Sequence, residues 1–315
     1  MAESPEVDKM LADIAEDLSS GAAELGLRAI NIYRHILTTD KRGLSAVKDE
    51  LAAVSIKLIN GQPAMAPLVN LANAILQSAD KAASLEELES AGLEAADRFE
   101  SRLCDSASRI AERVSKLVPS GEWVFAYSFS STVVSSLLNA RAERSPHTKL
   151  FRVVCTESRP SLEGRKLAAM LASAGLEVTH TFDSAMGLFL PNCRVAFMGV
   201  DAVARPGIVN KVGSWLLALA CRELKIPLYA LSGTEKFVPD DLLFSFENHE
   251  RPGSEIWDAP PSGVRVVNRQ FELIPFDWIS GLVTEDGVLK TEADVEKYVD
   301  ALNLHPALEQ LALAQ

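Results

Sequence analysis

The sequence predicts an α/β protein with an N-terminal helical bundle and a C-terminal domain built on a parallel sheet. Residues 1–118 contain apolar residues at helical spacing only, whereas residues 119–315 alternate short apolar runs with helix-length stretches. Such an alternation is typical of a parallel sheet that helices cover on both faces. The periodicity of the apolar residues changes at Pro119-Ser120-Gly121, which predicts a boundary between two domains, 1–118 and 119–315.

Helix start signals organise the N-terminal half. Ser4 precedes Pro5 and an acidic first turn, which favours a helix start at this point. Ser84-Leu85-Glu86-Glu87 matches a capping box and is expected to open a long helix. Between these two helices, periodic apolar segments predict further helices at residues 22–37, 44–59 and 68–76.

Runs rich in Val, Phe and Tyr organise the C-terminal half. They predict strands at residues 122–127, 149–155, 177–182, 194–200 and 227–231, and helices at 130–142, 162–174 and 210–224. In parallel sheets of this kind, ligands bind at the carboxyl ends of the strands. The loop at residues 239–261 is either a lid over such a site or a simple connection.

Composition excludes several classes of protein. With 43 acidic against 31 basic residues the formal charge is -12, which argues against direct nucleic-acid binding and against a membrane-surface protein. No signal peptide and no apolar run of roughly 20 residues is present, so we expect a cytoplasmic protein. The four cysteines and five histidines lack metal-ligand spacing, and dinucleotide and P-loop motifs are absent. We therefore expect neither a metal nor a cofactor.

Polar residues follow four of the predicted strands. They are Ser128 and Ser130 after the first strand, Glu157 and Arg159 after the second, Asp201 followed by Asn210 and Lys211 after the fourth, and Lys236 after the fifth. We expect Asn210 and Lys211 to begin a helix. Hydroxyls, backbone amides and a lysine near helix N-termini form a natural cradle for phosphate.

Each of these candidates has a purely structural alternative. Asp201 lies at a strand end, where burial could raise its pKa and suit it to general acid catalysis, or where it could simply cap a turn. The serines after the first strand could be an ordinary N-cap cluster. Glu157 and Arg159 could form a structural ion pair, and Lys236 could point into solvent.

Several motifs resemble those of a known superfamily. They are "TESRPSLEGRK" from Thr156, "MGVDAVARPGIVNKVGSW" from Met198, "PLYALSGTEKF" from Pro227 and the segment 263–289, together with Ser19–Ile30 and Gly61–Leu76. The superfamily contains the alpha, beta and delta subunits of eukaryotic initiation factor 2B, ribose-1,5-bisphosphate isomerase and methylthioribose-1-phosphate isomerase. The resemblance implies a Rossmann-like C-terminal domain, a ligand site between the two domains and a homodimer formed through the C-terminal domain.

The resemblance also implies roles for individual residues. Asp201 matches the aspartate that acts at the sugar ring oxygen, and Asn210, Lys211 and Lys236 match residues beside the substrate. Ser128 stands at the position of the isomerases' cysteine. Their two phosphate-binding motifs, each with an arginine, appear here as Ser20-Gly21 and as Gln62 followed by proline. A thiol with a pKa of roughly 8.5 yields thiolate near neutral pH, whereas a serine hydroxyl needs a base to activate it.

Two functions follow from these matches and departures. The first is an initiation factor 2B-like protein whose isomerase-type pocket binds a phosphorylated sugar or nucleotide for regulation, with degenerate catalysis. The second is an aldose-ketose isomerase, an intramolecular oxidoreductase, that acts on a 1-phosphorylated sugar such as ribose 1,5-bisphosphate. A scaffold with a vestigial pocket is a third reading. Whether the chain is an enzyme stays open, because a shared fold does not transfer activity.

Overall fold

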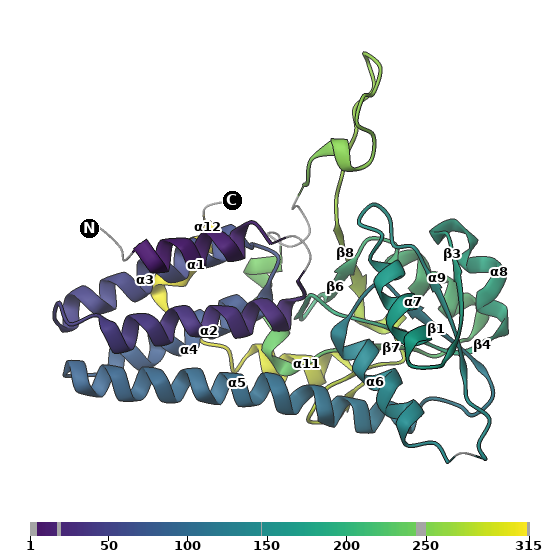
Figure 1. The fold of residues 1–315 in the computed structure, drawn as a ribbon, viewed down its shortest axis with the longest axis horizontal. Helices are drawn as coiled ribbons and strands as arrows, with labels where there is room; N and C mark the ends of the chain where they lie inside the picture. The colour runs from purple at the N-terminus through teal and green to yellow at the C-terminus, as the bar shows by residue number, and fades with distance from the viewer. Residues whose placement is uncertain (1–4, 18–19, 146, 244–249, 314–315) are drawn as a thin grey trace.

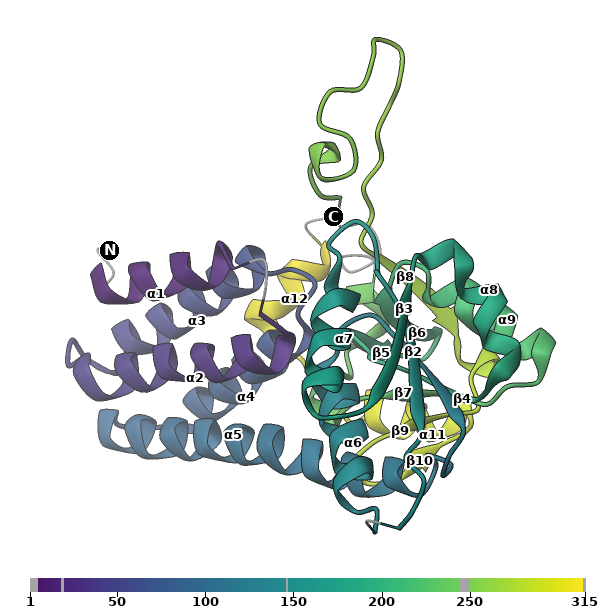
Figure 2. The same ribbon diagram turned by 45° about the vertical axis from the view of Figure 1, so that its right-hand side comes forward.

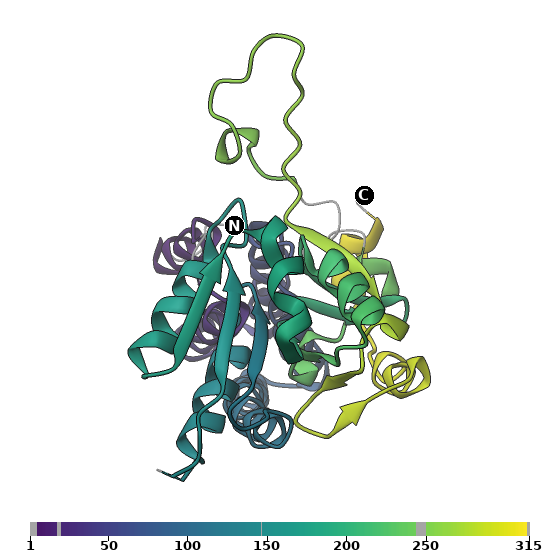
Figure 3. The same cartoon turned by 90° about the vertical axis from the view of Figure 1, so that its right-hand side faces the viewer.

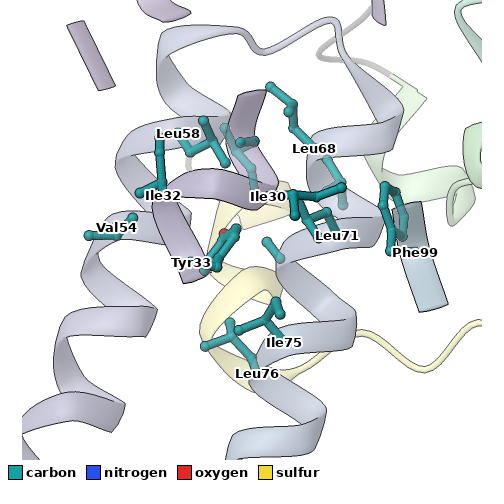
Figure 4. Close-up of a cluster of buried hydrophobic side chains, with 14 of the residues drawn as sticks. Ile30, Ile32, Tyr33, Val54, Leu58, Leu68, Leu71, Ile75, Leu76 and Phe99 are labelled. Atoms are coloured by element: carbon teal, nitrogen blue, oxygen red, sulfur yellow. The ribbon is translucent and has the colours of Figure 1, made fainter. Parts of the chain in front are cut away.

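Apolar residues at helical spacing build the N-terminal bundle (Figure 1). The computed structural model describes residues 5–17, 20–145, 147–243 and 250–313; the expected N-cap Ser4 lies outside them. The helices are α1 (Pro5–Ala15), α2 (Ala22–Thr39), α3 (Leu44–Gly61), α4 (Ala66–Lys81) and α5 (Leu85–Ser115). Their inner faces meet in a core around the fully buried Tyr33 (Figure 4). The predicted bundle is therefore confirmed, with α4 longer than expected.

The predicted capping box at the start of α5 is only half formed. The Ser84 hydroxyl accepts a hydrogen bond from the Glu87 backbone N–H at 3.2 Å, as predicted. The Glu87 carboxylate accepts from the Ala83 N–H at 2.8 Å instead of from Ser84. It therefore caps the chain one residue earlier than the motif predicts.

The C-terminal domain contains the predicted parallel sheet (Figure 3). Within the described residues the sheet has seven strands in the order β10-β9-β7-β4-β1-β2-β3. The bounds are β1 (Trp123–Tyr127), β2 (Arg152–Thr156), β3 (Glu177–Thr181), β4 (Cys193–Met198), β7 (Leu228–Leu231), β9 (Gly281–Val283) and β10 (Val288–Leu289). Every neighbouring pair is parallel except β9 and β10. The five predicted strands are present, and β9 and β10 were not predicted.

Helices cover both faces of this sheet. On one face α6 (Ser131–Ala142), α7 (Glu163–Ser173) and the end of α5 share an apolar core with the strands. On the other face lie α8 (Met186–Phe189), α9 (Ser214–Leu224) and α11 (Glu292–Val299), again with a shared core. The two coverings confirm the predicted α/β architecture.

A second, antiparallel sheet joins the two domains. It consists of β5 (Ala202–Ala204), β6 (Gly207–Lys211) and β8 (Phe271–Pro275). Ala202 and Val209 pack into the bundle core, whereas Val203 and Ile208 pack into the core of the parallel-sheet domain. Both faces of this small sheet are therefore buried between the domains.

The prediction that Asn210 and Lys211 begin a helix was wrong. Both residues belong to β6, and α9 begins only at Ser214. The turn at residues 205–206 returns the chain antiparallel to β5, and β6 then pairs with β8. The strand is too short, and too uniformly buried, to show a period of two in the sequence.

The chain ends on the bundle and carries a projecting arm. Helix α12 (Pro306–Leu313) packs against α3, with Leu308 fully buried in the bundle core. The arm, residues 252–267, projects from the body in Figures 1 and 2 and does not cover the parallel sheet. The described part of the predicted loop at 239–261 is thus mainly the first half of this arm; residues 244–249 lie outside the described part of the chain. Among the described helices, none is long and apolar enough to span a membrane.

Gly164 permits the close approach of α7 to the end of β2. A Cβ atom at this position would lie 1.6 Å from the carbonyl oxygen of Thr156. The contact is with backbone, so no side-chain rotation could relieve it. The start of α7 therefore depends on the absence of a side chain here.

We expect Gly164→Ala to lower the free energy of unfolding by about 3 kcal/mol or more, because β2 and α7 must separate to admit the methyl group. Urea unfolding would measure the change. Gly187→Ala is the matched control, since a Cβ at that helical position meets nothing within 4 Å. Equal stability of the two variants would contradict the close-approach argument.

Candidate functional site

A cavity of about 590 Å³ lies where the bundle meets the carboxyl ends of the parallel strands. Its walls come from the starts of α2, α6 and α7, from the segment around Gln62, and from the loops after β1, β4 and β7. Nine of the eleven predicted site residues line it: Ser20, Gly21, Gln62, Ser128, Ser130, Asp201, Asn210, Lys211 and Lys236. The structure thus brings together residues that are up to 216 positions apart in the sequence.

The other two predicted residues are not among those that line the cavity. Glu157 forms an ion pair with Arg165 at 3.3 Å, and not with Arg159 as the structural alternative assumed. Arg159 is exposed, and its backbone N–H donates to the Asp183 carboxylate at 2.8 Å. The residues after β2 that line the cavity therefore begin at Ser161, later in the loop than predicted.

Asp201 follows β4 and presents its carboxyl group to the cavity. Its backbone N–H donates to the Val209 carbonyl, which fixes the residue against β6. Within the described residues no hydrogen bond or ion pair to its carboxyl group is found. Burial raises the pKa of Asp201 to about 6; the nearby charges of Lys236 and Lys211 oppose this shift and that of Glu163 adds to it.

Lys211 is buried and fully engaged by protein groups. Its ammonium donates to the side-chain amide oxygen of Gln270 at 2.5 Å and to the Ser161 hydroxyl at 2.9 Å, and it pairs with Glu163 at 3.2 Å. Only 5% of Lys211 is exposed. Three acceptors offset the cost of burying this charge.

Ser128 lies directly after β1 in a strained conformation. Its φ of 59° places a non-glycine residue in the left-handed region. The hydroxyl donates to the second oxygen of the Glu163 carboxylate at 3.0 Å. Glu163 therefore joins Ser128 and Lys211 into one network at the cavity wall, and Ser128 has a carboxylate beside it that could accept a proton.

Three helix N-termini point their first turns at the cavity. Gly21 and Leu162 precede α2 and α7 without any side-chain cap, and Ser130 caps α6 through the Val133 N–H at 3.4 Å. At α7 the Gly164 and Arg165 N–H groups donate to the carbonyl oxygens of Glu157 and Leu162, both at 3.1 Å, so this helix contributes mainly its dipole. Unpaired backbone N–H groups and the positive end of each helix dipole favour a bound anion. The cavity is therefore suited to a phosphate group.

Two positions that the resemblance assigns to phosphate binding are used differently. The Gln62 amide nitrogen donates to the carbonyl oxygens of Ile14 and Asp17, both at 2.8 Å, and so holds the end of α1. The Ser20 backbone N–H donates to the Asp17 carboxylate. Asp17 also pairs with Arg28 at 2.5 Å, so this guanidinium is already bound to a carboxylate.

Charge in the cavity is balanced. Four acids and four bases line it: Asp17, Glu163, Asp201, Glu235, Lys166, Lys211, Lys236 and Arg251. Arg251 pairs with Glu255, and Lys236 donates to the Val200 carbonyl at 2.5 Å. Lys166 alone among the four bases has no carboxylate or carbonyl partner in the described residues; its ammonium lies 4.2 Å from the Phe129 ring centre.

Sequence reasoning missed Glu163, Lys166, Glu235 and Gln270. Glu163 was detectable, because it stands in the first turn of a predicted helix, where acids are common. Gln270 lies in a segment with no local signal, and it reaches Lys211 only through the pairing of β8 with β6. Among the described residues no group of three or more His, Cys, Asp or Glu could hold a metal, and no cysteine lines the cavity.

Comparison with known proteins gives concordant matches. Residues 18–291 match a protein family described as the Initiation factor 2 subunit family. A putative translation initiation factor eIF-2B subunit 2-like protein of Pyrococcus abyssi is 34% identical over 251 residues, covering 79% of this chain and 84% of that protein. A ribose 1,5-bisphosphate isomerase of Archaeoglobus fulgidus is 29% identical over 250 residues, covering 78% and 77%. The crystal structure of translation initiation factor eIF-2B from Pyrococcus horikoshii OT3 superposes with a TM-score of 0.78 at 28% identity, covering 93% of this chain and 100% of that one.

The raised pKa of Asp201 leads to a testable stability effect. The folded protein holds this proton more tightly than the unfolded chain, whose aspartates titrate near 3.9. The group's contribution to stability is therefore intact below about pH 4 and is lost as the pH rises through about 6. Asp201→Asn should consequently be more stable than the parent at pH 7.5, by on the order of 1–3 kcal/mol. At pH 5 this gain in stability should be smaller.

Urea unfolding of both proteins at the two pH values measures this difference. Asp258→Asn, a change in the exposed arm, is the control and should show no such pH-dependent gain. An Asp201→Asn variant that is less stable than the parent at pH 7.5 would refute the burial argument.

Proposed function

Because the chain belongs to the Initiation factor 2 subunit family, we propose that it is an initiation factor 2B-like protein whose cavity binds a phosphorylated sugar or nucleotide in a regulatory role. The observation that carries this proposal is the convergence of three helix N-termini on a cavity that also holds the unpaired carboxyl group of Asp201. A phosphate would occupy the helix ends, and the carboxyl group would accept from a sugar hydroxyl.

Three features favour binding over catalysis. Ser128 offers a hydroxyl where the resemblance places a cysteine in the isomerases. Lys211 is neutralised by Glu163, and the amide nitrogen of Gln62 holds α1 instead of facing a ligand. A regulatory pocket needs only to bind its ligand more tightly in one conformation of the protein than in another. The groups named above do not prevent this.

The isomerase remains the second candidate because one specific contact favours it. The hydrogen bond from Ser128 to Glu163 supplies the base that the serine needs, and Asp201, with a pKa of about 6, can act as a proton donor near neutral pH. In this reading Asp201 protonates the ring oxygen as its bond to C1 breaks, and Glu163, beside Ser128, takes the C2 proton to leave an enol. Glu163 then returns that proton to C1 while the C2 hydroxyl gives its proton to the Asp201 carboxylate, which yields the ketose and restores both acids.

We further propose a cytoplasmic homodimer formed through the C-terminal domain. The outer helices α8 and α9 leave large apolar side chains in solvent: Leu188 is 74% exposed, Leu216 58% and Leu224 42%. Covering these side chains with the same surface of a second copy would remove them from water.

Ligand binding is tested by thermal unfolding with ribose 1-phosphate, ribose 5-phosphate and unphosphorylated ribose. At a concentration near 100 times the dissociation constant a ligand stabilises by about 2.7 kcal/mol, which corresponds to roughly 5 °C or more. Lys166→Gln should weaken binding about tenfold or more through the loss of a charge-assisted contact. Arg165→Gln is the control, because Arg165 is not a lining residue. If no sugar phosphate raises the melting temperature, the proposal fails.

Turnover separates the two candidates. Incubation with ribose 1,5-bisphosphate or ribose 1-phosphate, followed by phosphorus NMR, should show no ketose phosphate if the pocket is regulatory. Formation of the ketose would establish the isomerase instead, provided that Glu163→Gln abolishes it. Glu157→Gln is the matched control, since that acid pairs with Arg165 away from the cavity.

A further inference from the structure

Glu235 is a buried carboxyl group whose side chain lacks a full set of partners. Only 5% of the residue is exposed, it lines the cavity, and its Oε2 atom is buried without a hydrogen-bond partner among the described residues. Burying an unpaired carboxyl oxygen is costly for the fold. Eight further buried side-chain atoms among the described residues lack a hydrogen-bond partner, but Glu235 also lines the cavity, where a ligand can supply the missing partner.

The backbone around Glu235 is held firmly. Asn70 on α4 donates to the carbonyl oxygens of Glu235 and Phe237 at 2.7 and 2.8 Å, and Glu285 accepts from the N–H and hydroxyl of Thr234. The side chain folds over Gly233, where an added Cβ would lie 2.0 Å from Oε2. The carboxyl group is thus positioned by its surroundings even though one of its oxygens is unsatisfied.

The charges near Glu235 do not neutralise it by contact. Burial, the largest effect, raises the pKa of Glu235, and the charge of Glu285 adds to this shift. Lys236, a hydrogen bond from the residue's own backbone N–H and the exposed Arg102 oppose it. Within the described residues it forms no ion pair. Lys236 is directed to the Val200 carbonyl, next to Asp201.

Sheet order places Glu235 at one end of the cavity. The residue follows β7, Asp201 follows β4, α6 with Ser130 follows β1, and Lys166 on α7 follows β2. In the order β7-β4-β1-β2, the strands that precede Glu235 and Lys166 are separated by three strand spacings. At about 4.8 Å per spacing, β7 and β2 lie about 14 Å apart. The cavity therefore runs from an unpaired cation at the β2 side to an unpaired carboxyl group at the β7 side.

We propose that Glu235 determines the ligand class by accepting a hydrogen bond from a ligand hydroxyl at the β7 side and by repelling a second phosphate there. This inference rests on the proposed function and specifies it. The ligand is a sugar monophosphate, with its phosphate near Lys166 and the start of α6 and with a hydroxyl-bearing end at Glu235. Like charges brought together in a dry site reject the wrong ligand more strongly than an added contact favours the right one.

The test compares ribose 1-phosphate, ribose 5-phosphate and ribose 1,5-bisphosphate by isothermal titration calorimetry. The parent protein should bind one of the monophosphates roughly tenfold or more tightly than the bisphosphate, because the second phosphate meets Glu235. Glu235→Gln keeps the shape and removes the charge, and it should shrink this preference by about tenfold. Glu50→Gln is the control, since Glu50 is an equally buried acid, 6% exposed, in α3 and outside the cavity.

The outcomes separate this inference from the proposed function. Preference of the parent protein for the bisphosphate, or an unchanged preference in a folded Glu235→Gln variant, overturns the role of Glu235 and leaves a phosphate-binding pocket standing. Absence of binding by all three compounds overturns both. The comparison within the parent protein needs no variant, so it decides the question even if Glu235→Gln folds poorly.

Discussion

The burial of the Lys211 ammonium group is the interaction on which the shape of the cavity depends. A buried cation must be surrounded by acceptors, and here these come from Ser161, Glu163 and Gln270. Ser161 and Glu163 belong to the segment after β2, and Gln270 precedes β8. Together with Lys211 on β6, a single charge therefore joins three parts of the chain that are remote in sequence. Glu163 then holds Ser128, which extends the same network to the end of β1.

This arrangement has a consequence for recognition. The protein neutralises Lys211 with its own carboxylate, so the charge is not fully available to a ligand. In the function that we propose, attraction for an anion comes instead from backbone N–H groups at the helix starts and from Lys166. The same proposal assigns hydroxyl recognition to Asp201 and Glu235, two acids that the described residues leave largely unpaired.

The sequence predicted the N-terminal helices and the parallel sheet because periodicity is strong in long helices and in strands that alternate with them. Nine of the eleven residues predicted for the site also line the cavity, since strand ends of a parallel sheet lie side by side and the family motifs carry polar residues there. It failed for β5, β6 and β8, because a sheet buried on both faces has no alternating pattern to detect. Glu235 was missed for another reason: neither its burial nor its unpaired oxygen can be read from a short "GTEKF" segment, since both depend on α4, α5 and Gly233.

The return of α12 to the first domain affects how the chain is made. The carbonyl oxygen of Asn303 accepts from Asn73 and Gln77, and the Asn73 side chain also accepts from the His305 N–H. Leu308 then fills a space in the core that helices α1 to α4 surround. On the ribosome, α1 to α5 emerge long before this last helix, and proteins ordinarily complete their early domains first. Here Leu308 belongs to the core of the earliest-synthesised unit, so that core is complete only after the last helix has been made.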